Sequence, residues 1–172
     1  MANRNLQIVS ICASLVLIFL IWLPIPLIYL NLSPSLPRGI YLRIPQDEVS
    51  VGDYVIYLPP EDTVAVMRRC GWLSAAASPH LFLKNIGALS GGSYTVSASN
   101  RSFFVNGQYV GEAMIEDSEG HPLPLAVGTH IVPENEFLPV AASSARSFDG
   151  RNTGTVPLDC IVAKVIPILV VD

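Results

Sequence analysis

The stretch SFFVNGQYVG, residues 102–111, predicts two antiparallel strands joined by a tight turn. Apolar and aromatic residues flank the pair Asn106-Gly107 on both sides. Asn-Gly favours the two-residue type I′ turn, whose twist matches the twist of the strands in a β-hairpin. A β-hairpin is therefore expected here.

Four further stretches have the apolar and β-branched composition of strands. They are DYVIYL from Asp53, LFLKNI from Leu81, SYTVSA from Ser93 and CIVAKVIPILVV from Cys160. The turn-forming stretches LPPED, LSGGS and DGRNTG separate them. One short helix is expected from Glu61 to Arg69. We therefore predict a mostly β, antiparallel domain with no internal repeat.

The residues from Leu6 to Leu30 contain no charged side chain. As a helix they would extend roughly 37 Å, enough to cross a hydrocarbon core of about 30 Å. We interpret them as a transmembrane helix, because the apolar part of a cleavable signal peptide has only about 7–15 residues. The predicted division is an N-terminal tail and transmembrane anchor over 1–30, and one β domain over 31–172.

Charge and motif content exclude two kinds of site. The 172 residues carry a formal net charge of −4, so no nucleic-acid-binding surface is expected. CxxC, HExxH and EF-hand patterns are absent from the sequence, and His80, His121 and His130 have no ligand-like spacing, so no metal or cofactor is expected.

Neither the orientation of the apolar segment nor the state of the cysteines follows from the sequence. Arg4 precedes the segment and two arginines follow it, so the positive-inside rule does not choose a side. Cys12 lies within the segment. Cys70 and Cys160 remain, either as one disulfide or as two buried thiols.

The only two lysines, Lys84 and Lys164, both lie in predicted apolar strands. Burial disfavours the ammonium form and lowers the pKa of a lysine, which makes its neutral amine available as a general base. A lysine in such a strand can instead extend its charged end into water. The two lysines are equal candidates on these grounds.

Ser35 is a candidate nucleophile in the stretch NLSPSLPRG, residues 31–39. Pro34 and Pro37 restrict the backbone around it, and Gly39 permits a turn or a close backbone approach. A serine becomes nucleophilic when a base takes its proton, and lysine serves as that base in serine–lysine enzymes. The other interpretation is a proline-rich linker next to the membrane.

Five motifs follow one another in a characteristic order. They are SPSLPRGIY (33–41), VGDYVIY (51–57), LKNIGALSGGSYTV (83–96), FVNGQYV (104–110) and SFDGR (147–151). In this order the chain resembles the membrane-anchored type I signal peptidases. The pattern serine, apolar residue, proline, any residue, glycine is most similar to the TraF-type branch, the conjugative-transfer signal peptidases.

The resemblance implies that Ser35 is the nucleophile and Lys84 the general base. It also implies that the hydroxyl of Ser33 helps the backbone N–H of Ser35 to form an oxyanion hole. Three residues of SFDGR are expected in supporting roles: Ser147 orienting the lysine, Asp149 as the acidic residue of the TraF branch, and Arg151 as its charge partner. The chain departs from the family pattern at Asn85, where relatives carry arginine, and at LSGG, where they carry proline-glycine-aspartate.

A fold and a function follow from the resemblance as expectations. The β domain would be of the signal-peptidase type and would need no cofactor. It would act in the periplasm, held by a single-pass anchor in the bacterial inner membrane. The monomeric enzyme would bind an extended precursor, a pilin or a signal-peptide-bearing preprotein, beside the strand of Lys84. Cleavage through an acyl-enzyme would end in hydrolysis or in cyclisation. A housekeeping signal peptidase and a catalytically silent assembly factor remain as alternatives.

Overall fold

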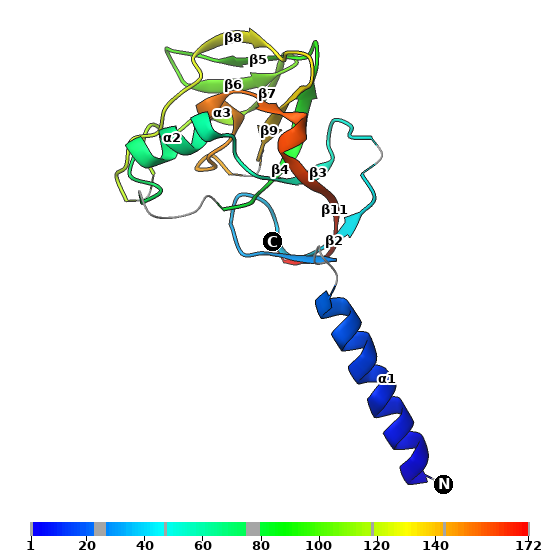
Figure 1. The fold of residues 1–172 in the computed structure, drawn as a ribbon. Helices are drawn as coiled ribbons and strands as arrows, with labels where there is room; N and C mark the ends of the chain where they lie inside the picture. Colours follow the sequence, from blue (N-terminus) through cyan, green and yellow to red (C-terminus); the bar gives the residue numbers. More distant parts are fainter. Residues whose placement is uncertain are drawn as a thin grey trace.

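The computed structural model describes residues 2–22, 27–46, 48–74, 80–117, 119–142 and 144–171. A helix, α1 (Ala2–Trp22), precedes a β domain that contains two antiparallel sheets. The smaller sheet lies at the opposite end of this domain from β2 (Arg38–Ile44) (Figure 1). The predicted mostly β, antiparallel class is confirmed.

The N-terminal apolar segment differs from its prediction. Instead of one helix through Leu30, α1 ends at Trp22 and a strand, β1 (Ile28–Asn31), pairs with β2. The intervening positions 23–26 of the predicted helix lie outside the described residues. Among the residues that the structure describes, no helix has both the length and the apolar character needed to cross a membrane. The predicted transmembrane anchor is therefore not supported.

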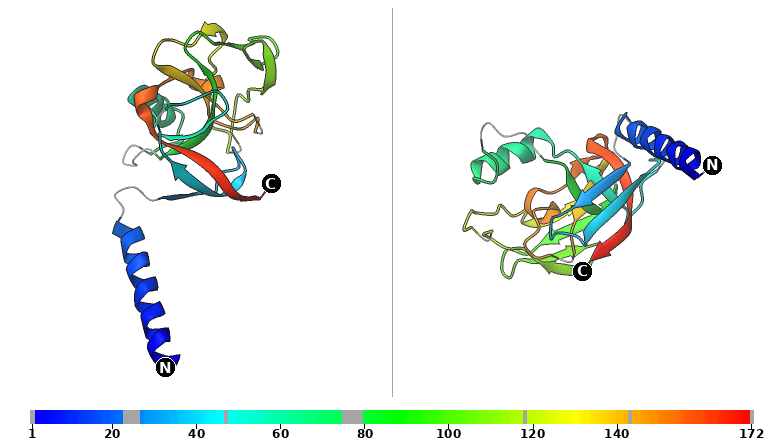
Figure 2. Two further views of the ribbon diagram at one scale, coloured as in Figure 1. Left: turned by 90° about the vertical axis from the view of Figure 1, so that its right-hand side faces the viewer. Right: turned by 90° about the horizontal axis from the view of Figure 1, so that it is seen from below.

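The larger sheet has seven strands in the order β1-β2-β11-β3-β4-β9-β10. Its remaining strands are β3 (Tyr54–Tyr57), β4 (Phe82–Leu89), β9 (Glu136–Val140), β10 (Val156–Pro157) and β11 (Ile161–Val171). β11 pairs with β2 along one edge and with β3 along the other, and Figure 2 shows it running beside β2. It therefore joins the N-terminal hairpin to the rest of the sheet.

Gly39 accounts for the close approach of β2 to β11. A Cβ atom at this position would lie 2.1 Å from the carbonyl oxygen of Leu169, and the backbone has φ +148°. Glycine alone accommodates both the contact and this dihedral angle without strain. The close backbone approach expected at Gly39 is thus confirmed, although it serves strand pairing.

The smaller sheet has the order β7-β6-β5-β8. Its strands are β5 (Ser93–Val96), β6 (Ser102–Val105), β7 (Gln108–Glu112) and β8 (Gly128–Ile131). The predicted hairpin is confirmed, because β6 pairs with β7 around Asn106 (φ 49°) and Gly107 (φ 77°). Two consecutive positive φ angles are the signature of the type I′ turn.

The helix α2 (Glu61–Arg69) has the bounds that the sequence predicts. Acidic residues in its first turn and basic residues in its last turn interact favourably with the helix dipole and stabilise the helix. Its buried side chains Val64 and Met67 pack in one cluster with Leu73, Leu123 and Phe148. This packing holds α2 beside the segment that contains the SFDGR motif.

A one-turn helix, α3 (Gly150–Thr153), and a 3-10 turn, η1 (Leu158–Cys160), flank β10. Cys70 and Cys160 are free thiols, as is Cys12, so no disulfide joins the first two. A core cluster that includes Leu36, Leu83 and Ala163 packs the serine segment, the lysine strand and β11 against one another.

Candidate functional site

The turn between β1 and β2 carries the candidate nucleophile and is held by one buried side chain, that of Asn31. Its Nδ2 donates to the carbonyl oxygens of Ser33 (3.2 Å), Leu36 (3.1 Å) and Pro37 (3.0 Å). Its Oδ1 accepts from the backbone N–H of Ser33 at 3.1 Å. The prolines restrict this turn and the amide of Asn31 fixes its shape. The sequence analysis did not identify Asn31.

Within this turn, the side chains of Ser33 and Ser35 lie next to each other. The Ser33 hydroxyl donates to Oγ of Ser35 at 3.1 Å and accepts from the Ser35 backbone N–H at 3.3 Å. One O–H and one N–H donor therefore lie beside the candidate nucleophile. Such a pair is what stabilises the oxyanion of a tetrahedral intermediate.

Lys84 lies in the middle of the sheet, on β4, with a 4% exposed side chain. Its Nζ donates to Oγ of Ser147 at 2.8 Å, across a large separation in sequence. Burial lowers the pKa of Lys84 from 10.5 to about 8, while the carboxylate of Asp149 raises it and the guanidinium of Arg151 lowers it. An amine with this pKa is half neutral near pH 8 and is suited to act as a general base.

The other lysine has a different environment. Nζ of Lys164 lies 2.6 Å from Oδ2 of Asp53, and both side chains are 20% exposed. It also donates to the carbonyl oxygen of Glu48 at 3.4 Å. An ammonium held by a carboxylate and reached by water is a structural ion pair. The structure therefore separates two lysines that composition leaves equal.

Behind Lys84 lies a buried ion pair between Asp149 and Arg151, each 1% exposed. Nε and Nη2 of Arg151 donate to the two carboxylate oxygens at 2.9 and 3.2 Å. The guanidinium also donates to the carbonyl oxygens of Glu112 (2.9 Å) and Ala141 (3.0 Å), and Asp149 accepts from the N–H of Ala141 at 2.9 Å. Such complete bonding is what a buried ion pair requires. The pair fixes the segment that presents Ser147 to Lys84.

Ser33, Ser35 and Lys84 all line one cleft of about 430 Å³. Its apolar lining includes Met67, Trp72, Leu81, Phe82 and Phe148. Ser147 reaches the cleft through its hydrogen bond to Lys84. Asp149 and Arg151 act from further behind it, through the segment that they fix.

Two lining residues that the sequence analysis did not place in the site are Arg146 and His80. Arg146 directly precedes Ser147, and His80 comes four residues before Lys84 in the sequence. Their positions next to the two site motifs in the sequence could have indicated that they belong to the site.

Of the two departures from the family pattern, Asn85 lies within β4 and only the LSGG stretch forms a turn. The side-chain amide of Asn85 donates to the carbonyl oxygen of Gly52 at 3.1 Å, which ties β4 to the turn before β3. The LSGG stretch closes the β4–β5 connection with a hydrogen bond from Gly92 N to Leu89 O at 2.8 Å. Neither Asn85 nor a residue of LSGG is among the described residues that line the cleft.

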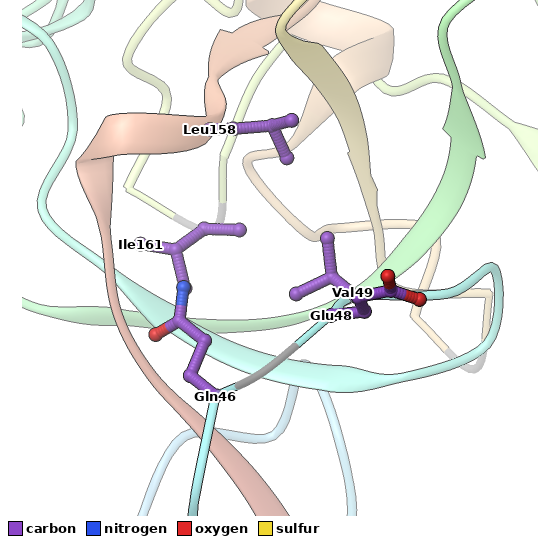
Figure 3. A pocket seen from close by; sticks show the side chains of 5 residues that line it. All are labelled: Gln46, Glu48, Val49, Leu158 and Ile161. Carbon is purple, nitrogen blue, oxygen red and sulfur yellow. The ribbon is translucent and has the colours of Figure 1, made fainter.

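A second hollow of about 350 Å³ lies between the segment after β2 and the start of β11 (Figure 3). It is lined by Gln46, Glu48, Val49, Leu158 and Ile161. None of these five residues is a candidate from the sequence motifs, so the cleft of Ser35 and Lys84 is the candidate active site.

The chain matches a known protein family over most of its length. The family model described as "Signal peptidase, peptidase S26" matches residues 3–170 of the chain. A search of curated proteins finds no match.

Proposed function

Because the chain belongs to the signal peptidase family, peptidase S26, we propose that it is a serine endopeptidase in which Ser35 is the nucleophile and Lys84 the general base. The family acts on precursors that carry signal peptides. One observation carries the assignment of the pair: a buried lysine with a pKa of about 8 shares a cleft with a serine in a rigid turn.

The first step forms an acyl-enzyme. Oγ of Ser35 attacks the scissile carbonyl carbon while the neutral Nζ of Lys84 takes the hydroxyl proton. The Ser35 N–H and the Ser33 O–H donate to the oxyanion that develops. The intermediate then collapses, the C–N bond breaks, and the ammonium of Lys84 gives its proton to the leaving amine.

The second step releases the product. A water molecule attacks the ester carbonyl, Lys84 accepts a proton from it, and the ester bond to Ser35 breaks with return of the proton to Oγ. An amine of the substrate itself in place of water would give a cyclic product. The resemblance to the TraF-type branch supports a conjugative pilin precursor as the substrate, and a broad-specificity signal peptidase is the alternative.

We also place the β domain in the periplasm, at the surface of the inner membrane, where a membrane-tethered precursor presents its cleavage site. This part of the proposal rests on the family resemblance.

Cleavage of a purified precursor in detergent micelles tests the proposed function. The wild-type protein should release a defined product, and mass spectrometry should show whether that product is linear or lacks the mass of one water and is therefore cyclic. Ser35→Ala should abolish cleavage and leave the circular dichroism spectrum unchanged. Cleavage by Ser35→Ala at the wild-type rate would show that Ser35 is not the nucleophile.

A further inference from the structure

The cleft contains hydrogen-bond donors that the reaction as described does not use. Arg146 and His80 line it, and across the described part of the chain neither side chain takes part in an ion pair or a hydrogen bond. Nε1 of Trp72, another lining residue, is buried and has no hydrogen-bond partner among the same residues. The lining of the cleft thus includes two polar side chains and one buried indole N–H that have no partner among the described residues.

Several other basic side chains of the described chain, though not all of them, are paired with carboxylates. Arg68 lies 3.2 Å from Glu61, Lys164 pairs with Asp53, and Arg151 with Asp149. The described lining of the cleft, by contrast, includes Arg146, His80 and Lys84 and no aspartate or glutamate. Among the described lining residues, no carboxylate balances the permanent positive charge of Arg146.

The chemistry of these groups defines what they can bind. The guanidinium is permanently charged and presents its N–H groups in a planar fork that matches a carboxylate. The indole N–H can only donate. Charge-assisted bonds from arginine to a carboxylate are stronger than bonds between neutral groups. A carboxylate is therefore the class of ligand that fits this lining.

The position of the donors relates them to the reacting groups. The ring of Trp72 packs on Phe148 with centroids 4.7 Å apart, and Phe148 follows Ser147, which holds Lys84. Arg146 precedes the same serine. These donors therefore belong to the side of the cleft that carries the base. A substrate group bound there would come from a residue near the cleavage site of the precursor.

We propose that the cleft contains a carboxylate-binding subsite, formed by Arg146 with His80 and Trp72, that recognises a precursor with a carboxylate near its cleavage site. This inference rests on the proposed function and narrows its substrate class. The carboxylate can be the side chain of an aspartate or glutamate or the free C-terminus of a short precursor.

Matched synthetic peptides test the proposal and distinguish the two sources. One set carries glutamate, glutamine or lysine at each position flanking the scissile bond in turn, and a second set differs only in a free or amidated C-terminus. We expect the wild-type protein to prefer the carboxylate form of one set by roughly tenfold or more in kcat/KM, mostly through KM. The set that shows the preference identifies the source.

Variants assign the preference to the subsite. Arg146→Gln should bring the ratio between carboxylate and neutral peptides close to unity, and Arg146→Lys should restore part of it. The control is Arg69→Gln, an exposed arginine of α2 outside the cleft, which should keep the wild-type ratio. Because the measurement is a ratio within one protein sample, partial loss of folded protein does not affect it.

Two results would overturn the inference. Equal kcat/KM for carboxylate, neutral and cationic peptides in the wild-type protein, or an unchanged preference in Arg146→Gln, would show that no such subsite exists while cleavage itself stands. A wild-type protein that cleaves none of the peptides nor any precursor would instead overturn the proposed function and this inference with it.

Discussion

Nζ of Lys84 lies 2.8 Å from Oγ of Ser147, and both side chains are buried. Lys84 lies on β4 and Ser147 lies in the loop before α3, so the two residues meet only in the folded domain. Ser147 thereby holds the amine of Lys84, which lines the same cleft as Ser35.

The first prediction concerns Ser147→Ala. Loss of a hydrogen bond to a charged group costs about 1.5–3 kcal/mol, so kcat should fall roughly 10- to 100-fold while KM changes little. Ser147→Thr, which keeps the hydroxyl, should recover part of the rate. A variant with a higher KM and a wild-type kcat would show that Ser147 acts in substrate binding and not on the base.

The second prediction is a pH dependence. Because burial lowers the pKa of Lys84 to about 8, kcat/KM should rise with pH up to about 8 and level off above it, since only the neutral amine accepts a proton. Lys84→Arg should be inactive, because arginine stays protonated. Lys164→Arg is the matched control and should keep most activity through an ion pair with Asp53. The reverse pattern would assign the base to Lys164.

The third prediction concerns stability, through the same pKa. The folded-state pKa of Lys84 lies below the ordinary value of 10.5, so the unfolded chain binds more protons between about pH 8 and 10.5. The buried amine of Lys84 therefore lowers the free energy of unfolding most below pH 8, and this destabilisation disappears as the pH rises to 10.5. Urea unfolding should show that, over that pH interval, the free energy of unfolding of the wild-type protein rises by on the order of 3 kcal/mol relative to that of Lys84→Met. Parallel pH profiles of the two proteins would contradict the shift.

The fourth prediction tests the buried ion pair. Arg151→Met leaves the carboxylate of Asp149 buried without its partner and should lower the free energy of unfolding by about 3–5 kcal/mol. The control is Arg68→Met, which breaks the exposed pair with Glu61 and should cost less than about 1 kcal/mol. Equal effects of the two substitutions in urea unfolding would show that the Asp149–Arg151 pair does not stabilise the fold.

The fifth prediction concerns Ser33. Its hydroxyl lies 3.1 Å from Oγ of Ser35, so Ser33→Ala removes one donor to the oxyanion and leaves the attacking group in place. The rate should fall by about 10²–10³, less than the complete loss expected for Ser35→Ala. Single-turnover kinetics would measure this directly, and a wild-type acylation rate in Ser33→Ala would remove the hydroxyl from the oxyanion hole.

The sequence predicts the parts of the fold in which local signals agree. Asn106-Gly107 sits between apolar strands, and the helix from Glu61 to Arg69 has acidic residues at its start and basic ones at its end. β1 was missed because it continues an apolar run, and a short apolar stretch has no period that separates strand from helix. β9 was missed because EFLPV is short and contains a proline.

Of the candidate site, the sequence predicts only the residues that belong to a recognisable motif. Ser35, Lys84 and Ser147 each stand in a recognisable motif, and the structure brings the lysine to Ser147 and into the cleft of Ser35. Asn31 and Arg146 stand next to these motifs, and their neighbourhood alone does not assign them a role. The role of Asn31 depends on a turn that returns the carbonyl groups of Leu36 and Pro37 to its amide, which is a property of the folded backbone.

The place of β11 in the larger sheet governs when the site can form during synthesis of the protein. β11 is the strand between the hairpin that carries Ser35 and the strands that lead to Lys84, yet it follows both residues in the sequence. A ribosome adds residues from the N-terminus onward, at about 5–20 per second. A nascent chain that already contains the serine and the lysine therefore lacks the strand that connects their parts of the sheet. The growing polypeptide therefore cannot complete the candidate site until β11 has emerged and paired.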